Sequence, residues 1–287
     1  MKKLFVLFLS LVLTIMMFPS MAFASSDMLM TQESKKVKVN EYDLIEALSK
    51  ETPSELTKKG YSAEEIQKIK NYKSLYKEHI IKMSKLSDDV LKKLRYTDKQ
   101  IEVIRNFSGS VDEMRRASVT LQLEAFPTNF KKDGNYTTGE ISFFWSMNGI
   151  PLFRMTDIVG ISWNGWAVTS KHCNVWYYDI NSGQTTHVKS ATSISPKVTA
   201  GSLAGAGFKF NLVPDYTYSC ALYGEGSWKV RSDVQAKKDF YYYIAYGHNE
   251  YAVSVGFSVS ATGPSVGLDF NLGYNEMDSK SGRVIPK

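Results

Sequence analysis

The spacing of apolar and polar residues divides the chain into two parts that meet near Arg116. Between residues 41 and 116, apolar residues recur every three or four positions, which is the period of amphipathic helices. From Ala117 onward, apolar and polar residues alternate in short runs, which is the period of β-strands. The pattern therefore predicts an α+β protein, with a small helical region at 41–116 followed by an antiparallel all-β domain at 117–287, expected to be a β-sandwich.

The helical part contains a two-copy internal repeat with an offset of 35 residues, which relates residues 56–72 to residues 91–107. In both copies a serine or threonine is followed three residues later by a glutamate or glutamine. This is the pattern of a capping box, and it predicts helix starts at Ser62 with Glu65 and at Thr97 with Gln100. Each copy is expected to form a short helix, a tight turn and a longer helix. Two interpretations stay open: a docking module for a partner, or two packed helical hairpins, which we favour because two copies are too few for a solenoid.

Turn signals separate the strands expected in the second part. They are Lys132–Asn135, Asn164-Gly165, Asn181–Gly183 and Thr262–Pro264. Asn-Gly between apolar runs favours a two-residue hairpin, so Trp163 and Trp166 are expected to flank a turn between paired strands. About ten short strands at this spacing are typical of an antiparallel sandwich or barrel.

Residues 1–24 have the pattern of a secretory signal peptide. Lys2 and Lys3 precede an apolar run, and small residues frame an expected cleavage site after Ala24. An uncleaved membrane anchor is the alternative, because the apolar run is just long enough to span a bilayer. We expect a secreted, extracellular protein in which residues 25–40 form a flexible linker.

The charge balance limits the choice of partner. The net charge of +6 falls to +4 when Lys2 and Lys3 leave with the signal peptide. This balance does not indicate a nucleic-acid partner, for which a dense basic face is expected. It permits weak attraction to anionic cell-wall polymers or lipid headgroups.

The chain has two cysteines, Cys173 and Cys220. An even pair in an exported protein favours a disulfide, which would stabilise the fold by about 4 kcal/mol through loop entropy. The alternative is two buried thiols that never meet. One disulfide is too little to serve as a scaffold, so the apolar core must supply most of the stability.

No motif specifies catalysis, a metal or a cofactor, and we expect a non-enzymatic protein. The elbow Gly-x-Ser-x-Gly is absent, and the histidines lack metal-ligand spacing: His79, His172, His187 and His248. Paired carboxylates for glycoside hydrolysis stay open, because distance in sequence does not give distance in space. The candidates are Glu124, Glu140, Asp157, Asp179, Asp215 and Asp233. Asp157 lies in an apolar run, where a position near a strand edge or bend is expected.

The density of aromatic residues is the stronger lead. Trp163, Trp166, Trp176 and Tyr178 crowd one stretch of the all-β domain. Exposed and coplanar rings would stack on sugars or peptides, whereas the alternative is plain strand core. We therefore expect a binding protein at the bacterial cell surface or in the medium, with a glycan, a wall polymer or another protein as its partner.

The segment from Tyr251 to Tyr274 suggests a second function. It has apolar residues on one face and small or polar residues on the other, in two arms of about ten residues, the length of a membrane-spanning strand. A β-hairpin pore-forming or membrane-active protein is therefore the alternative, and only this alternative involves membrane contact. Any half-buried hairpin shows the same alternation, which favours the sandwich interpretation. An extracellular hydrolase with dispersed carboxylates is the third hypothesis.

Overall fold

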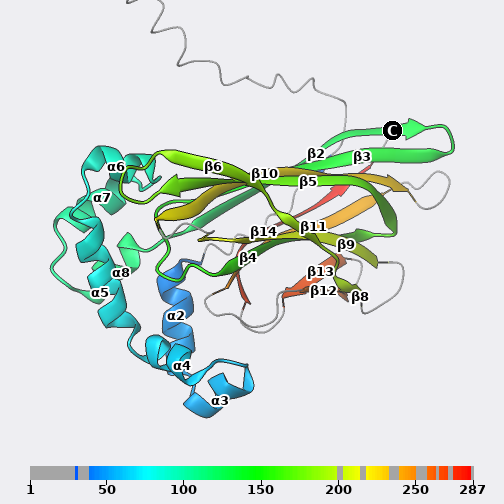
Figure 1. Cartoon of the computed structure of the whole chain (residues 1–287). Helices are drawn as coiled ribbons and strands as arrows, with labels where there is room; N and C mark the ends of the chain where they lie inside the picture. Colours follow the sequence, from blue (N-terminus) through cyan, green and yellow to red (C-terminus); the bar gives the residue numbers. More distant parts are fainter. Residues whose placement is uncertain are drawn as a thin grey trace, which may run out of the picture.

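The computed structural model describes residues 30–31, 39–198, 203–213, 218–232, 239–249, 257–262, 265–270 and 274–285. The expected signal peptide, residues 1–24, lies outside this part. Within the expected linker, Met30–Thr31 form a short strand, β1, that pairs with the last strand. In the described residues, seven helices are followed by mostly antiparallel sheets, as the change of pattern near Arg116 predicts (Figure 1).

The helices come in short segments that begin at well-formed caps. They are α2 (Glu41–Lys50), α3 (Pro53–Lys58), α4 (Ala63–Lys70), α5 (Tyr72–Met83), α6 (Asp88–Lys93), α7 (Asp98–Arg105) and α8 (Val111–Ala117). Both predicted capping boxes are confirmed. The Ser62 hydroxyl accepts from the Glu65 N–H at 3.3 Å, and the Thr97 hydroxyl accepts from the Gln100 N–H at 3.2 Å. Each bond satisfies a backbone donor that a helix start leaves without a partner.

The turns that lead into α4 and α7 share an unusual backbone conformation. Gly60 has φ of 94°, and Arg95, which stands 35 residues later, has φ of 68°. Glycine adopts this left-handed region freely, whereas a residue with a Cβ atom does so at a cost of about 1–2 kcal/mol. The turn before α7 therefore has a strained arginine at the position where the turn before α4 has an unstrained glycine.

The described strands form three sheets. One has the order β1-β14-β11-β4-β9-β7, with β14 (Tyr274–Val284), β11 (Phe240–Asn249), β4 (Thr156–Asn164), β9 (Leu203–Asn211) and β7 (Thr192–Ile194). The second has the order β2-β3-β10-β5-β6, with β2 (Leu121–Asp133), β3 (Tyr136–Met147), β10 (Ser219–Ser232), β5 (Trp166–Asp179) and β6 (Thr185–Ser190). The third has the order β13-β12-β8, with β13 (Ser265–Phe270), β12 (Phe257–Thr262) and β8 (Lys197–Val198). We call the first two the six-stranded and the five-stranded sheet.

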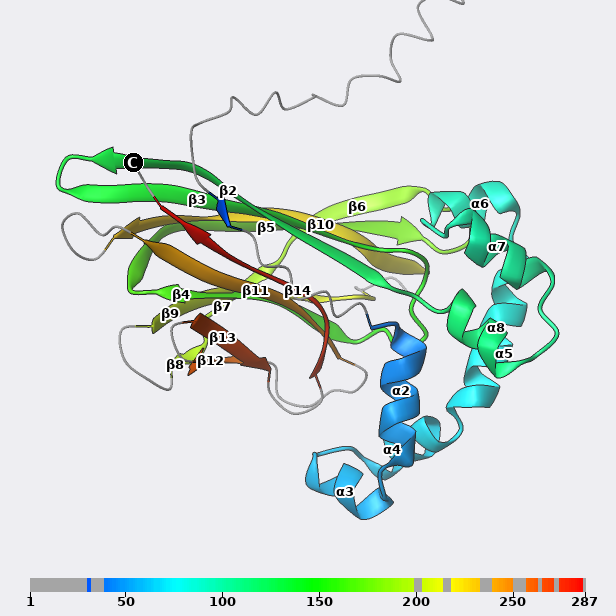
Figure 2. The same ribbon diagram turned by 180° about the vertical axis from the view of Figure 1, so that it is seen from behind.

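The six-stranded and five-stranded sheets face each other across an aromatic core (Figures 1 and 2). The Trp145 ring from β3 stacks on the Phe210 ring from β9, with 4.9 Å between centroids and 7° between planes. Phe143 and Phe208 stack across the same gap at 6.2 Å. The helical region lies at one end of these layers, and its last helix, α8, leads into β2.

The expected hairpin at Asn164-Gly165 is wrong. Gly165 does form a turn, with φ of 54°, but β4 belongs to the six-stranded sheet and β5 to the five-stranded sheet, so the chain crosses between layers here. The flanking residues explain the crossing. Trp163 and Trp166 are each only 1% exposed, and burial of both indoles in the shared core stabilises the crossing.

Three other predicted turns join paired strands. Asp133 pairs with Tyr136 at the tip of β2 and β3, and Thr262 pairs with Ser265 at the tip of β12 and β13. The Asn181–Gly183 turn joins β5 to β6 and is held by Asp179, whose carboxylate accepts the N–H groups of Asn181 and Ser182. The turns at Lys132–Asn135 and Asn181–Gly183 are confirmed, whereas residues 263–264 of the third turn lie outside the described residues.

The expected disulfide between Cys173 and Cys220 is wrong in this structure, where both are free, buried thiols. The register of β5 against β10 gives the reason. Cys173 lies opposite Gly226, whereas Cys220 lies opposite Tyr178, so the cysteines are five residues apart along the ladder. That offset is about 17 Å, far beyond the reach of a disulfide.

Candidate functional site

The four aromatic residues singled out by the sequence separate into two pairs. Trp163 and Trp166 lie in the core, and the Trp163 Nε1–H donates to the Trp166 carbonyl oxygen at 2.5 Å. Because both side chains are buried, the prediction that they bind a ligand is wrong. Trp176 and Tyr178 are half-buried and belong to the outer face of the five-stranded sheet.

The alternation of side chains along β5 explains this outward placement. Cys173, Val175 and Tyr177 are buried, so the residues between them face away from the core. Trp176 and Tyr178 therefore share the solvent-facing side of the sheet with outward residues of β10, β3 and β2.

Four aromatic rings, one from each of four adjacent strands, form a continuous row on this face. Trp176 meets Tyr223 edge to face at 5.1 Å between centroids. Tyr223 stacks on Phe144 at 6.3 Å, and Phe144 stacks on Phe126 at 5.9 Å. We call Phe126, Phe144, Tyr223 and Trp176 the aromatic stripe. Exposed apolar patches of this kind are a common mark of a binding surface.

Carboxylates flank the stripe on both sides of Phe144. Its register partner on β2 is Glu124, and its register partner on β10 is Glu225. The Tyr223 hydroxyl donates to the Glu225 carboxylate at 2.7 Å. Burial and the neighbouring Glu225 raise the pKa of Tyr223, so this phenol keeps its proton and its role as a donor. The row therefore combines apolar ring surface with hydrogen-bond acceptors.

The helical region contributes a cation to the same surface. Arg95, in the strained turn before α7, holds its guanidinium carbon 5.3 Å from the centre of the Tyr223 ring. A cation at this distance from an aromatic ring is attracted by the ring quadrupole. Strained backbone is retained where the surrounding structure uses it, and here it positions a charged group beside the stripe.

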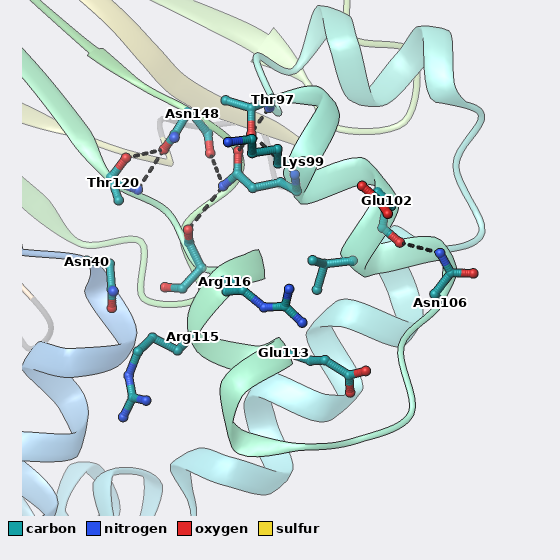
Figure 3. A pocket seen from close by; sticks show the side chains of 13 residues that line it. Asn40, Thr97, Lys99, Glu102, Asn106, Glu113, Arg115, Arg116, Thr120 and Asn148 are labelled. Atoms are coloured by element: carbon teal, nitrogen blue, oxygen red, sulfur yellow. Dashed lines mark hydrogen bonds between the residues drawn. The ribbon is translucent and has the colours of Figure 1, made fainter.

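A separate pocket of about 710 Å³ lies between α7, α8 and the start of β2 (Figure 3). Arg116 extends from α8 into this space, and the rim carries both cations and carboxylates, including Lys99, Glu102 and Glu113. The Gln100 side-chain amide closes the floor by donating to the carbonyls of Ser118 and Asn148. Because charges of both signs line the pocket, it presents no single electrostatic preference, and we take the stripe as the stronger candidate site.

Two of the carboxylates considered for hydrolysis, Asp157 and Asp179, are bound by internal partners. Asp215 and Asp233 lie outside the described residues. Asp179 holds the turn between β5 and β6. Asp157, expected near a strand edge or bend, is instead fully buried in β4, between β9 and β11 in the six-stranded sheet. Its carboxylate binds internal partners rather than facing solvent.

The histidines and thiols show no metal or nucleophile site in the part of the chain that the structure describes. No group of three or more histidine, cysteine, aspartate or glutamate residues there is arranged to hold a metal ion. Burial raises the pKa of the Cys220 thiol to about 12, which keeps it in its unreactive protonated form. Among the same described residues, no helix has the length and apolar character needed to cross a membrane.

Comparisons with known proteins identify no family. No family model matches the chain, and no curated protein sequence matches it. Two solved structures share part of its shape at low similarity. One is AvmM, described as catalysing macrocyclization in alchivemycin A biosynthesis, with 10% identity, a TM-score of 0.27 and coverage of 57% of this chain and 89% of that one. The other is described as a pore forming protein, with 8% identity, a TM-score of 0.24 and coverage of 58% and 91%. Scores this low carry no argument about function.

Proposed function

We propose that this chain is a secreted, non-enzymatic binding protein of the bacterial cell surface, and that its aromatic stripe binds a glycan such as a wall polymer. The observation that carries the proposal is the row of four rings on one face of the five-stranded sheet. Sugar rings have apolar C–H faces that pack on aromatic rings and hydroxyl groups that donate hydrogen bonds. The stripe offers a partner for each of these groups, because aromatic rings and carboxylates that accept hydrogen bonds lie side by side.

The geometry of the stripe suits an extended polymer. Its four rings come from adjacent strands spaced about 4.8 Å apart, so the row runs for about 14 Å across the sheet. Glu124 and Glu225 lie on either side of the Phe144 ring, where they can accept from hydroxyl groups at the edge of a stacked sugar. The rings are fixed by strands and by one another, so binding orders few side chains and loses little conformational entropy.

The proposal includes two finer statements about the fold. The two large facing sheets are assigned to the β-sandwich class, supported by the aromatic contacts between β3 and β9. The helical region is assigned to a two-copy repeat. The Lys70 ammonium donates to the carbonyls of Ser49 and Glu51, and Arg105, 35 residues later, donates to the equivalent carbonyls of Ser84 and Leu86. We assign this region the role of a support that holds Arg95 against the stripe.

Retention on insoluble polysaccharides tests the glycan proposal. The mature chain, residues 25–287, is mixed with purified peptidoglycan, chitin or cellulose, and the bound fraction is compared with that of Trp176→Ala. The matched control is Tyr136→Ala, because Tyr136 is 41% exposed on β3 of the same sheet but lies outside the stripe. We expect retention on at least one polymer, reduced by Trp176→Ala and unchanged by Tyr136→Ala. Equal retention of all three proteins would contradict the proposal.

A membrane-active role for the β12–β13 hairpin is the second candidate. This hairpin belongs to the small third sheet and packs on the six-stranded sheet through Phe257 and Val259. Beneath this hairpin, β9 carries two glycines, Gly205 and Gly207. A Cβ atom on Gly205 would come within 2.8 Å of Val259, and one on Gly207 within 2.5 Å of Phe257. The missing side chains of these glycines let Phe257 and Val259 pack closely on the six-stranded sheet.

Dye release from liposomes tests the second candidate. Release by the mature chain at micromolar concentration would support it. Vesicles that stay intact over the same concentration range would contradict the membrane-active role. Together with retention on a glycan, that result would support the binding role.

A further inference from the structure

A buried carboxylate joins the helical region to the β domain. Glu41, the first residue of α2, is only 1% exposed. Its carboxylate accepts from the backbone N–H groups of Leu152 and Phe153, at 2.9 and 2.8 Å, and from the Tyr76 hydroxyl at 2.9 Å. The first helix is thus fastened by a charge to the segment that leads into β4.

A histidine lies between this carboxylate and a second one. The His248 Nε2 atom is 3.6 Å from the Glu41 carboxylate, and its Nδ1 atom is 2.9 Å from the Asp157 carboxylate. Asp157 also accepts from the Tyr246 hydroxyl at 2.5 Å and from the Asn249 N–H at 3.0 Å. Asp157 and His248 are fully buried. The array therefore runs from α2 to the middle of the six-stranded sheet.

Buried charges of this kind depend on every partner in the array. Removing one partner leaves an uncompensated charge in a medium of low dielectric constant, which is strongly destabilising. Protonation of a carboxylate has a similar effect, because it removes the charge that holds the donors in place. The contact between α2 and β4 is thereby coupled to the acidity of the surroundings.

We propose that the Glu41–His248–Asp157 array is an acid-sensitive latch that fastens the helical region to the β domain and releases α2 when the surroundings become acidic. The release concerns the contact between α2 and the segment before β4, and it does not depend on glycan binding.

The direction of the pH effect follows from the pKa of Glu41. Burial alone raises its pKa, but the nearby His248 imidazole and the backbone donors of Phe153 and Leu152 outweigh burial and hold the pKa below its usual 4.5. A carboxylate with a lowered folded-state pKa contributes stability that is present above pH 4.5 and lost as the pH falls through the folded-state value. The latch therefore holds at neutral pH and opens at a pH below about 4.5.

His79 on α5 acts in the same direction. Burial lowers its pKa from 6.5 to about 4, so the folded state resists the proton that the unfolded state accepts. Stability is consequently lost as the pH falls from 6.5 towards 4. The other titratable or charged groups around the array are Tyr76 on α5, Tyr96 before α7, Arg154 before β4, Cys220 on β10 and Tyr246 on β11.

Hydrogen exchange of the mature chain at a series of pH values from 6 down to 3, corrected for intrinsic rates, tests the latch. We expect peptides covering 41–48 and 150–155 to lose protection at a pH below about 4.5, while the strand interior at 141–147 keeps it. Loss of protection at all three places together would mean global acid unfolding and would contradict the latch. The readout does not involve a glycan, so its failure is separate from failure of the proposed function.

Two substitutions test whether the acid-induced loss of protection arises from the Glu41–His248–Asp157 array. Tyr76→Phe removes one donor to the Glu41 carboxylate and should move the midpoint of this loss up by about one pH unit. Glu41→Gln should remove most of the loss of protection below pH 4.5 and leave the part that His79 contributes between pH 6.5 and 4. Glu78→Gln is the matched control, because Glu78 is an exposed carboxylate on α5 that accepts from the Ser74 hydroxyl of the same helix, and it should behave as wild type. A wild-type midpoint in Tyr76→Phe would overturn the proposal even if Glu41→Gln did not fold.

Discussion

Trp176 and Tyr223 lie directly opposite each other on β5 and β10, and their rings meet edge to face at 5.1 Å with 64° between planes. This pair connects β5 and β10 to the stacked rings of Phe144 on β3 and Phe126 on β2. Because the contact is made between strands that are far apart in sequence, it exists only in the folded protein. The proposed binding surface therefore depends on the register of the sheet.

Arg95→Gly should separate stability from function. Glycine relieves the left-handed strain of about 1–2 kcal/mol, adds about 0.5–1 kcal/mol of unfolded-state entropy and loses the cation–π contact of about 0.5–1 kcal/mol, so the stability of the variant in urea should lie within about 1 kcal/mol of wild type. It also removes the cation over Tyr223, so glycan binding should weaken. Gly60→Ala, at the equivalent turn, should be less stable than wild type. A loss of more than about 1 kcal/mol in Arg95→Gly would show that the turn does not store strain.

Two tryptophan substitutions should differ sharply in stability. Trp166→Ala empties a fully buried site and should lower the free energy of unfolding by about 3–5 kcal/mol. Trp176→Ala removes a half-buried ring and should lower it by about 1 kcal/mol. Chemical denaturation followed by far-UV circular dichroism measures both. Similar losses in the two variants would contradict the placement of Trp176 on the outer face.

The two cysteines should react as buried thiols. Non-reducing mass spectrometry is expected to find the full mass with both thiol hydrogens present. Alkylation at pH 8 should be slow in the native protein and fast in urea, because burial raises the pKa of Cys220 to about 12. A mass that lacks the two thiol hydrogens would restore the disulfide that the sequence suggested.

Local signals in the sequence predicted the parts of the fold that depend on neighbouring residues. The capping boxes at Ser62 and Thr97 and the change from helix to strand near Arg116 involve residues a few positions apart, and the structure confirms them. Asn164-Gly165 misled because its turn conformation is compatible with either a hairpin or a crossing between layers. Burial of Trp163 and Trp166 decided between the two.

The candidate site was only partly predictable, because its residues come together through sheet register. Trp176 was identified from local aromatic density, but Phe126, Phe144 and Tyr223 lie in other strands, and nothing local in the sequence indicates that their rings meet that of Trp176. Arg95 needed a backbone conformation that the sequence does not reveal, although its place opposite Gly60 in the repeat was a usable clue. Asp157 was recognised as unusual, but its partner His248 is 91 residues away.

The most direct test of the glycan-binding stripe is the dissociation constant of the mature chain for a soluble fragment of the retained glycan, measured by isothermal titration calorimetry. Phe144→Ala removes the ring at the middle of the stripe, between Glu124 and Glu225, while Tyr136→Ala removes an exposed ring of the same strand outside it. We predict that Phe144→Ala weakens binding about tenfold, which corresponds to about 1.4 kcal/mol, and that Tyr136→Ala binds as wild type. Unchanged affinity in a folded Phe144→Ala variant would contradict the proposed role of the stripe.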